Sequence, residues 1–259
     1  MVRIIKSEIT KLKRYSMVWV GFAAMLLVVL LTRFEATANN GVTYTFQDFS
    51  NAAIWNSFTL IFPATITLIA GYIINREQTD DTLKNILTIP VTFRRLLVGK
   101  LITVGMLAIL FGAVSFVLTL IVFLMSGFPG LSAAVMVQSL FQMIGMNLCI
   151  YLAVLPIIVF TSRSTNGFMA GVGFAFFYGF VGIFASGHNL TNVYPIVAGL
   201  GIINYQEVGG STYNLPLCYL TMFLVFLVSV ALIAVMGNRI KEPKAKKRTA
   251  RQKHKGRGR

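Results

Sequence analysis

The amino-acid sequence predicts an all-α integral membrane protein with about six transmembrane helices and with both termini in the cytoplasm. Composition is the first observation behind this fold class: the 259-residue chain is 56% hydrophobic and only 12% charged, with a mean hydropathy of +0.75. Such values lie outside the range of ordinary soluble domains. The other two observations are the long charge-free intervals and the uneven distribution of Lys and Arg between them.

A helix needs roughly 20 apolar residues to cross the hydrocarbon core of a bilayer. Five intervals without Asp, Glu, Lys or Arg contain 18, 27, 62, 43 and 31 residues. The interval of 62 residues has to hold two spans, and Gly127-Phe128-Pro129-Gly130 is the expected turn between them. We therefore expect six spans: Tyr15–Thr32, Ile54–Ile74, Leu101–Met125, Leu131–Phe160, Phe168–Ala185 and Leu215–Met236.

The basic residues predict the topology. Of 23 Lys and Arg residues, only Arg33 falls on one side of a six-span layout, where it is outnumbered by acidic residues. The other 22 fall on the opposite side, in four places: residues 1–14, 75–100, 163 and 237–259. Because cytoplasmic loops carry the excess of Lys and Arg, this second side is predicted to be cytoplasmic, together with both termini.

Residues 1–14 are predicted to form an interfacial amphipathic helix on the inner leaflet. Apolar residues recur there at helical spacing, with basic residues elsewhere around the helix: Val2, Ile5, Ile9 and Leu12. A plain positively charged flank is one alternative. A cleavable signal peptide ending near Ala36-Thr37-Ala38 is a second alternative, which the length of the apolar part disfavours.

Two features stand out within the six-span domain, residues 15–238. The fourth span is longer than a bilayer requires and contains Pro156, so it is predicted to be tilted, kinked or split. Its polar residues Gln138, Gln142 and Asn147 fit either a path for an amphipathic substrate or hydrogen bonds between helices. The segment Tyr194–Asn204 is apolar but too short to span, which is typical of a re-entrant or interfacial element.

Residues 239–259 are predicted to form a disordered, basic cytoplasmic tail, because they combine low complexity with the absence of an apolar face. RNA is one conceivable partner of such a tail. Anionic lipid headgroups explain it more simply, because they attract juxtamembrane basic residues with about 1 kcal/mol each. We therefore expect membrane lipids, and no nucleic acid, as partners.

The sequence offers no set of residues for catalysis. Histidine occurs only at His188 and His254, so the usual metal ligands are not assembled, and the nucleotide-binding pattern G-x-x-x-x-G-K-[ST] does not occur. All 8 carboxylates lie outside the expected spans, whereas ion-driven transporters place ionisable groups within the membrane. We therefore expect no enzyme, no cofactor and no metal site, and we expect another subunit to supply the energy for any transport.

The segment Asn75–Lys100 joins the second and third spans and predicts a cytoplasmic helix near residues 79–88. Thr79 can cap the start of this helix, and Asp80 and Asp81 suit its first turn. Leu83, Ile86 and Leu87 form one apolar face, and Pro90 ends the helix. A rigid helix joined to two spans would transmit a push on its surface to both. The alternative is a short helix that only lies on lipid.

This segment resembles the coupling helix of the permease subunits of type 2 ABC exporters, which docks on a partner ATPase. The residues that match the pattern of that loop are Glu77, Asp81, Thr82, Leu83, Leu87, Pro90, Arg94, Arg95 and Lys100. Asp81 stands where many members carry Gly. The resemblance implies an ATPase-coupling interface made of Glu77, Thr79, Asp80, Asp81, Thr82, Leu83, Lys84, Leu87, Pro90 and Arg94.

The same resemblance extends to the interfacial opening at Ile5–Arg14 and to the six-span layout, and it is greatest to the bacitracin and lantibiotic self-protection exporters. It implies a permease in the bacterial cell membrane, paired with a second permease subunit and with ABC ATP-binding subunits that carry ATP and Mg. That complex would export an amphipathic peptide, antibiotic or lipid-like substrate. A non-transporting membrane scaffold or channel subunit is the alternative function.

Overall fold

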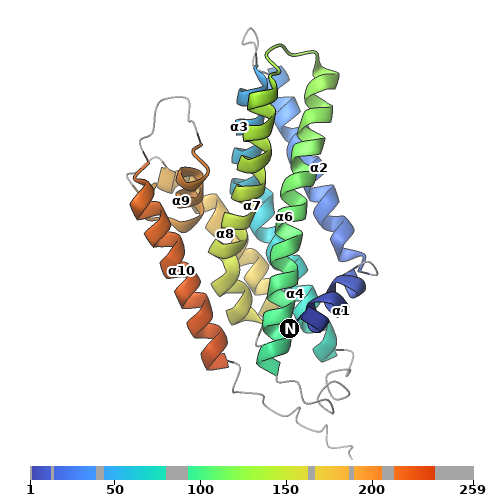
Figure 1. Ribbon diagram of the computed structural model, residues 1–259, viewed down its shortest axis with the longest axis vertical. Helices are drawn as coiled ribbons and strands as arrows, with labels where there is room; N and C mark the ends of the chain where they lie inside the picture. Colours follow the sequence, from blue (N-terminus) through green and yellow to red (C-terminus); the bar gives the residue numbers. More distant parts are fainter. Residues whose placement is uncertain are drawn as a thin grey trace, which may run out of the picture.

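The computed structural model describes residues 2–12, 15–38, 44–79, 93–162, 167–186, 190–205 and 213–236. All regular structure in these ranges is helical. Figure 1 shows most helices running along the long axis of the molecule, with α1 lying across them at one end. The helices are α1 (Val2–Leu12), α2 (Met17–Ala38), α3 (Phe46–Asn56), the π-helix η1 (Ser57–Ile61), α4 (Phe62–Thr79), α6 (Phe93–Ser126), α7 (Ala133–Thr161), α8 (Gly167–Ser186), α9 (Pro195–Ile202) and α10 (Leu215–Met236).

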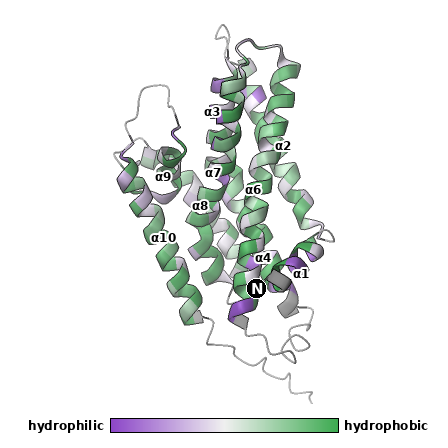
Figure 2. Cartoon of the chain, in the orientation of Figure 1, coloured by the Kyte–Doolittle hydropathy of each residue, from purple (hydrophilic) through white to green (hydrophobic). Residues whose placement is uncertain are grey.

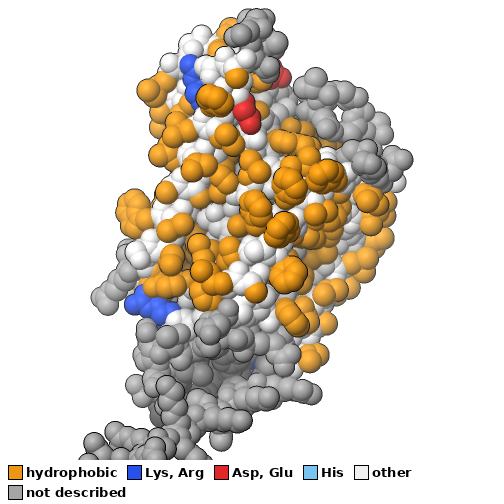
Figure 3. All heavy atoms as spheres, turned by 180° about the vertical axis from the view of Figure 1, so that it is seen from behind, with side chains coloured by type: hydrophobic (Ala, Val, Ile, Leu, Met, Phe, Trp, Pro, Cys, Tyr) orange, Lys and Arg blue, Asp and Glu red, His pale blue; other side chains and the backbone are white. Residues whose placement is uncertain are grey.

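Six helical stretches of the described residues are long and apolar enough to cross a membrane, which confirms the prediction of an all-α membrane protein with about six spans. They are Met17–Ala38, Phe46–Arg76, Arg94–Ser126, Ala133–Thr161, Gly167–Ser186 and Leu215–Val235. Hydrophobic residues follow these helices along their length (Figure 2), and hydrophobic side chains cover the middle of one face, with visible charges near its ends (Figure 3). Helix α1 and the last turn of α10 lie at the same end, which we call the α1 end (Figure 1).

The helices extend further than the expected spans, so Glu35 and Asp48 lie within helices of the first two candidate spans. The prediction that every carboxylate lies outside the spans is wrong for these two residues. Charge-free intervals mark only the part of a helix that suits hydrocarbon, whereas a helix continues wherever its polar groups find partners. Glu35 accepts a 2.7 Å hydrogen bond from Asn56, and Asp48 forms a capping box with Thr45.

The second span changes helix type near its middle. Pro63 has no backbone N–H, so it cannot donate to the carbonyl of Thr59. One residue earlier, the N–H of Phe62 bonds to the carbonyl of Ser57, five residues back, and this closes the π-helical turn of η1. Gly179 of α8 packs directly on this turn: a methyl group there would lie 2.7 Å from the carbonyl oxygen of Phe58.

The second span and α7 form the centre of the bundle. In their most apolar windows 72% and 61% of the residues are buried, against 28% for α2, α8 and α10. The six largest fully buried side chains in the described part are all phenylalanines: Phe46, Phe49, Phe58, Phe62, Phe111 and Phe123. The outer helices therefore present their remaining apolar surface to lipid or to other membrane proteins.

The structure shows the outcome of two predictions, one for the fourth span and one for the short apolar segment before the last span. Helix α7 runs unbroken through Pro156, so the fourth span is not split, and Ser132 caps its start by accepting a 3.3 Å hydrogen bond from the N–H of Val135. The short apolar segment predicted before the last span forms α9, whose residues Ile196–Gly201 are buried. Eight residues of helix cover only about 12 Å, so α9 does not span a bilayer.

The contact at Gly179 predicts the effect of a single methyl group. We expect Gly179→Ala to lower the stability by about 1–3 kcal/mol, because the methyl group would collide with the backbone of η1. Gly173→Ala in the same helix is the matched control: a methyl group there meets nothing within 4 Å, and alanine in a helix is favoured over glycine by about 0.5–1 kcal/mol. Thermal unfolding in detergent measures both, and equal shifts would contradict the assigned packing.

Candidate coupling interface

Helix α1 crosses the beginning of α6 at a glycine. A methyl group at Gly99 would lie 2.7 Å from Cγ2 of Ile4, so the Ile4 side chain packs directly on the backbone of α6. Lys6 and Ser7 on the other side of α1 are exposed. The predicted amphipathic helix is therefore present, and the structure packs part of its length against protein.

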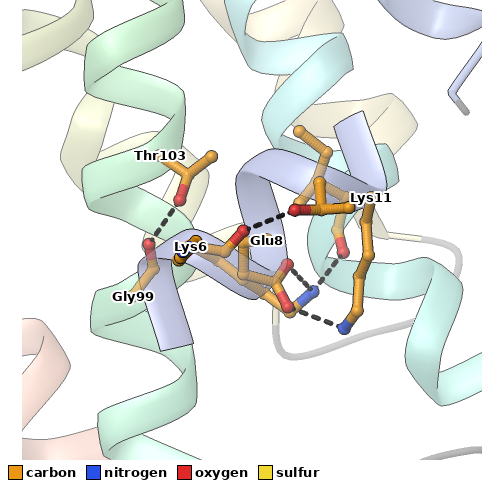
Figure 4. Close-up of polar contacts among 8 residues, drawn as sticks. Lys6, Glu8, Lys11, Gly99 and Thr103 are labelled. Carbon is orange, nitrogen blue, oxygen red and sulfur yellow. Dashed lines mark hydrogen bonds and ion pairs between the residues drawn. The ribbon is translucent and has the colours of Figure 1, made fainter. Parts of the chain in front are cut away.

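Lys100 joins three helices at one buried point. Its Nζ lies 3.1 Å from Oε2 of Glu8 in α1 and donates a 2.9 Å hydrogen bond to the carbonyl of Ile73 in α4. The other oxygen of the Glu8 carboxylate accepts a 2.7 Å bond from Lys11, and Figure 4 shows the side chains of Glu8 and Lys11 pointing toward each other. The side chains of Glu8 and Lys100 are only 2% and 3% exposed. The two charges are therefore shielded from water and compensate each other.

Two opposing effects act on the carboxyl group of Glu8. Burial alone would raise its pKa, because a carboxylate is poorly solvated inside the protein. The positive charge of Lys100 and the hydrogen bonds from Lys11 and Lys100 favour the carboxylate, and together they hold the pKa of Glu8 below its ordinary value. Glu8 is therefore ionised at neutral pH, and its contact with Lys100 is an ion pair.

An aromatic and cationic cluster lies beside this ion pair. The guanidinium carbon of Arg76 in α4 lies 4.7 Å from the ring centre of Tyr15, which connects α1 to α2. Nη1 of Arg76 also donates a 3.1 Å hydrogen bond to the hydroxyl of Tyr72, and the Tyr15 and Tyr72 rings meet edge to face. This cluster joins the start of α2 to the last turns of α4.

The predicted coupling residues fall in three groups. Glu77 and Thr79 belong to the last turn of α4, and Arg94 is exposed in the first turn of α6. The remaining predicted residues, Asp80, Asp81, Thr82, Leu83, Lys84, Leu87 and Pro90, lie outside the described part of the chain. Helices α4 and α6, which flank that segment, contact each other.

The expected break between the second span and a helix starting at Thr79 is absent from the described residues. Thr79 is the last residue of α4, which continues five residues past Ile74. The sequence Asn-Arg-Glu-Gln-Thr contains neither glycine nor proline, so nothing in it interrupts the helix. The predicted cap at Thr79 depends on the residues that follow it, which lie outside the described part of the chain, so it stays a prediction.

Sequence reasoning missed the ion pair at the centre of this end. The sequence places Lys100 only in the coupling-loop pattern, and Glu8 only among the 8 carboxylates outside the expected spans. The partners are 92 residues apart, so no local spacing connects them. The available signal was the position of Glu8 on the helix, one turn after Ile4, which contacts the protein.

Buried polar groups also occur away from the α1 end. Nε2 of Gln142 in α7 donates to the carbonyls of Ile203 and Asn204, at 3.2 and 3.1 Å. Within the described chain, Nδ2 of Asn147 is buried without a hydrogen-bond partner. Two explanations were predicted for these polar residues, a path for substrate and hydrogen bonds within the bundle. The structure shows such hydrogen bonds for Gln142.

The described residues contain no group of three or more His, Cys, Asp or Glu side chains that would hold a metal ion. Cys149 and Cys218 are buried and unbonded to each other. What the α1 end offers chemically is a set of fixed charges and exposed basic side chains, which suits binding rather than catalysis.

The ion pair makes a prediction that a double-mutant cycle tests. We expect Glu8→Gln to destabilise the protein by about 3–5 kcal/mol, because it leaves the buried Lys100 ammonium without a counter-charge. Adding Lys100→Met should recover much of the loss. Lys11→Met is the control: its side chain is 36% exposed, and its loss should cost less than about 1 kcal/mol. Additive single effects in thermal unfolding would show that Glu8 and Lys100 are not coupled.

Comparison with known proteins assigns the chain to a family. The family model of ABC-2 family transporter proteins matches residues 4–182, from within α1 to within α8. The chain is also 36% identical over 129 residues to the bacitracin transport permease protein BCRB of Bacillus licheniformis, a match that covers 49% of this chain and 61% of that protein. Since the family model covers more than half of the chain, including most of α1, Lys100 and the first four candidate spans, the chain belongs to the ABC-2 family of transporter proteins.

Proposed function

We propose that this permease exports an amphipathic peptide, antibiotic or lipid-like molecule, driven by ATP hydrolysis on a separate ABC ATP-binding subunit. The cargo of the relative, bacitracin, motivates this class of substrate. ATP and Mg belong to the partner in this proposal. A second permease subunit, identical or different, completes the complex.

The observation that carries the proposal is the connection of three helices through Lys100. The segment of residues 80–92 is flanked by α4 and α6, and Lys100 bonds both to the α4 carbonyl of Ile73 and to Glu8 of α1. A force applied to that segment would reach α1, α4 and α6 together, because they are joined about two turns of helix from its ends. We therefore assign residues 79–88 to the ATPase contact.

The proposal requires the α1 end to be cytoplasmic. The exposed residues Lys6, Arg94 and Arg95 lie at this end, as the excess of basic residues on the inner side of membrane proteins demands. The multi-pass permease then lies in the bacterial cell membrane with both termini inside. The basic tail, residues 239–259, would contact anionic lipid headgroups there.

The coupling assignment predicts the effect of two substitutions. We expect Leu83→Asp combined with Leu87→Asp to abolish co-purification of the ATPase and to remove cargo-stimulated ATP hydrolysis, because charges would replace the apolar docking face. Leu190→Asp, at an exposed leucine between α8 and α9, is the control and should bind the ATPase normally. Unchanged binding and turnover in the double variant would refute the assignment.

The topology makes a separate prediction for intact cells. We expect Lys84→Cys to resist a membrane-impermeant maleimide until the cells are permeabilised, whereas Leu190→Cys should react at once. The native cysteines are buried and give the background. Rapid labelling of Lys84→Cys from outside would reverse the orientation and remove the proposed ATPase contact.

A further inference from the structure

Helix α6 presents one continuous stripe of side chains to the outside of the bundle. Its apolar part contains the exposed residues Ile102, Met106, Ile109 and Leu110, which recur at helical spacing. Arg95 is exposed seven residues before Ile102, which is two turns away on the same side of the helix. The stripe therefore joins an apolar surface of the kind that faces lipid to a cation at the α1 end.

Helix α1 crosses this stripe. Gly99, on which the side chain of Ile4 packs, lies four residues after Arg95 and three before Ile102. Residues at these spacings are neighbours on one side of an α-helix. Because α1 lies across α6 (Figure 1), Arg95 is on one flank of α1 and the apolar part of the stripe begins on the other.

The surface of α1 that faces away from α6 changes from apolar to polar around the helix. Ile5 and Ile9 are partly exposed on one edge, and Ser7 and Thr10 are exposed on the other. Lys6 is exposed between these two edges, by the helical spacing of the five residues. A long basic side chain at such a boundary covers apolar surface with its methylene groups and holds its charge at the level of lipid headgroups.

The charges of Lys6 and Arg95 are not compensated within the described part of the chain, where neither side chain has an ion pair. Glu8 is the carboxylate of α1, and it is buried between Lys100 and Lys11, so its charge is already neutralised. Two exposed cations beside one crossing favour an anionic ligand. The apolar stripe next to them favours an anion that carries hydrocarbon chains.

We propose that the crossing of α1 and α6 binds one anionic phospholipid of the inner leaflet. Its phosphate lies between Lys6 and Arg95, and an acyl chain runs along Ile102 and Met106. The bound lipid holds α1 against α6, which are two of the three helices that share Lys100. The choice of leaflet rests on the proposed orientation, whereas the binding itself requires neither ATP nor cargo and is independent of export.

Arg94 separates this site from the proposed ATPase contact. It is exposed like Arg95, but one residue corresponds to about 100° around the axis of an α-helix. Arg94 therefore points away from the stripe and from the crossing. We assign Arg95 to the lipid and leave Arg94 in the ATPase contact.

Native mass spectrometry of the purified full-length protein in detergent measures this binding. The protein is titrated with phosphatidylglycerol and, separately, with phosphatidylcholine that has the same acyl chains, and the anionic lipid should bind more tightly. Arg95→Gln and Lys6→Gln should each weaken phosphatidylglycerol binding about fivefold, the factor that corresponds to about 1 kcal/mol per basic residue near an anionic membrane surface. Arg95→Lys keeps the charge and should keep most of the affinity. Equal affinities for the two lipids overturn the proposal.

Arg94→Gln is the matched control, because it removes the same charge from the adjacent exposed position, and the basic tail is present in every variant. This variant should bind phosphatidylglycerol as the natural protein does. An equal loss in Arg94→Gln and Arg95→Gln would show that net charge alone attracts the lipid, and it would overturn the site.

Two further measurements separate the lipid from other ligands. Met106→Gln leaves both charges in place and should still weaken phosphatidylglycerol binding, because it makes the acyl-chain surface polar; unchanged affinity would reject the lipid in favour of a free phosphate. Co-purification tests the ATPase as the occupant. If Arg95→Gln loses the ATPase and keeps its affinity for phosphatidylglycerol, Arg95 belongs to the ATPase contact and the lipid site is rejected.

Discussion

The structure depends on one buried contact between opposite charges. Glu8 and Lys100 meet inside the protein while Lys100 also holds the carbonyl of Ile73, so three helices share one ammonium group. A buried ion pair adds little net stability compared with an apolar pair of the same shape, but each partner is costly to leave alone. The pair therefore favours one arrangement of α1, α4 and α6, and every proposed movement at this end has to carry the three helices together.

Different kinds of interaction stabilise the two ends of the molecule. The α1 end relies on charges and on the cation–π cluster of Arg76, whereas α9 is held by glycine contacts and by neutral hydrogen bonds from Gln142 and Tyr194. Ionic contacts shielded from water resist separation strongly. Neutral hydrogen bonds contribute about 1 kcal/mol each. The contacts at the α1 end are therefore harder to separate than those around α9.

The sequence predicted the fold class, all six spans, the N-terminal helix and the short element before the last span, because hydropathy and charge act locally along the chain. It did not predict the ion pair of Glu8 with Lys100 or the bonds of Gln142 to the turn after α9, because their partners lie 92 and about 60 residues away. The predicted first span ended too early and the predicted second span began too late, since Glu35 and Asp48 find partners that only the folded chain supplies. The coupling residues 80–90 lie outside the described residues and stay a prediction.

The π turn at Ser57–Ile61 has a consequence for how relatives are compared. Such a turn holds one residue more than an α-helical turn, and one residue corresponds to about 100° around the axis of an α-helix. Everything from Phe62 onward is thereby rotated with respect to α3, so the first half of this span faces α2, α6 and α7 while the second half also packs along α8. A relative lacking one residue here would carry the same amino acids on different faces, and would have to choose different neighbours for them.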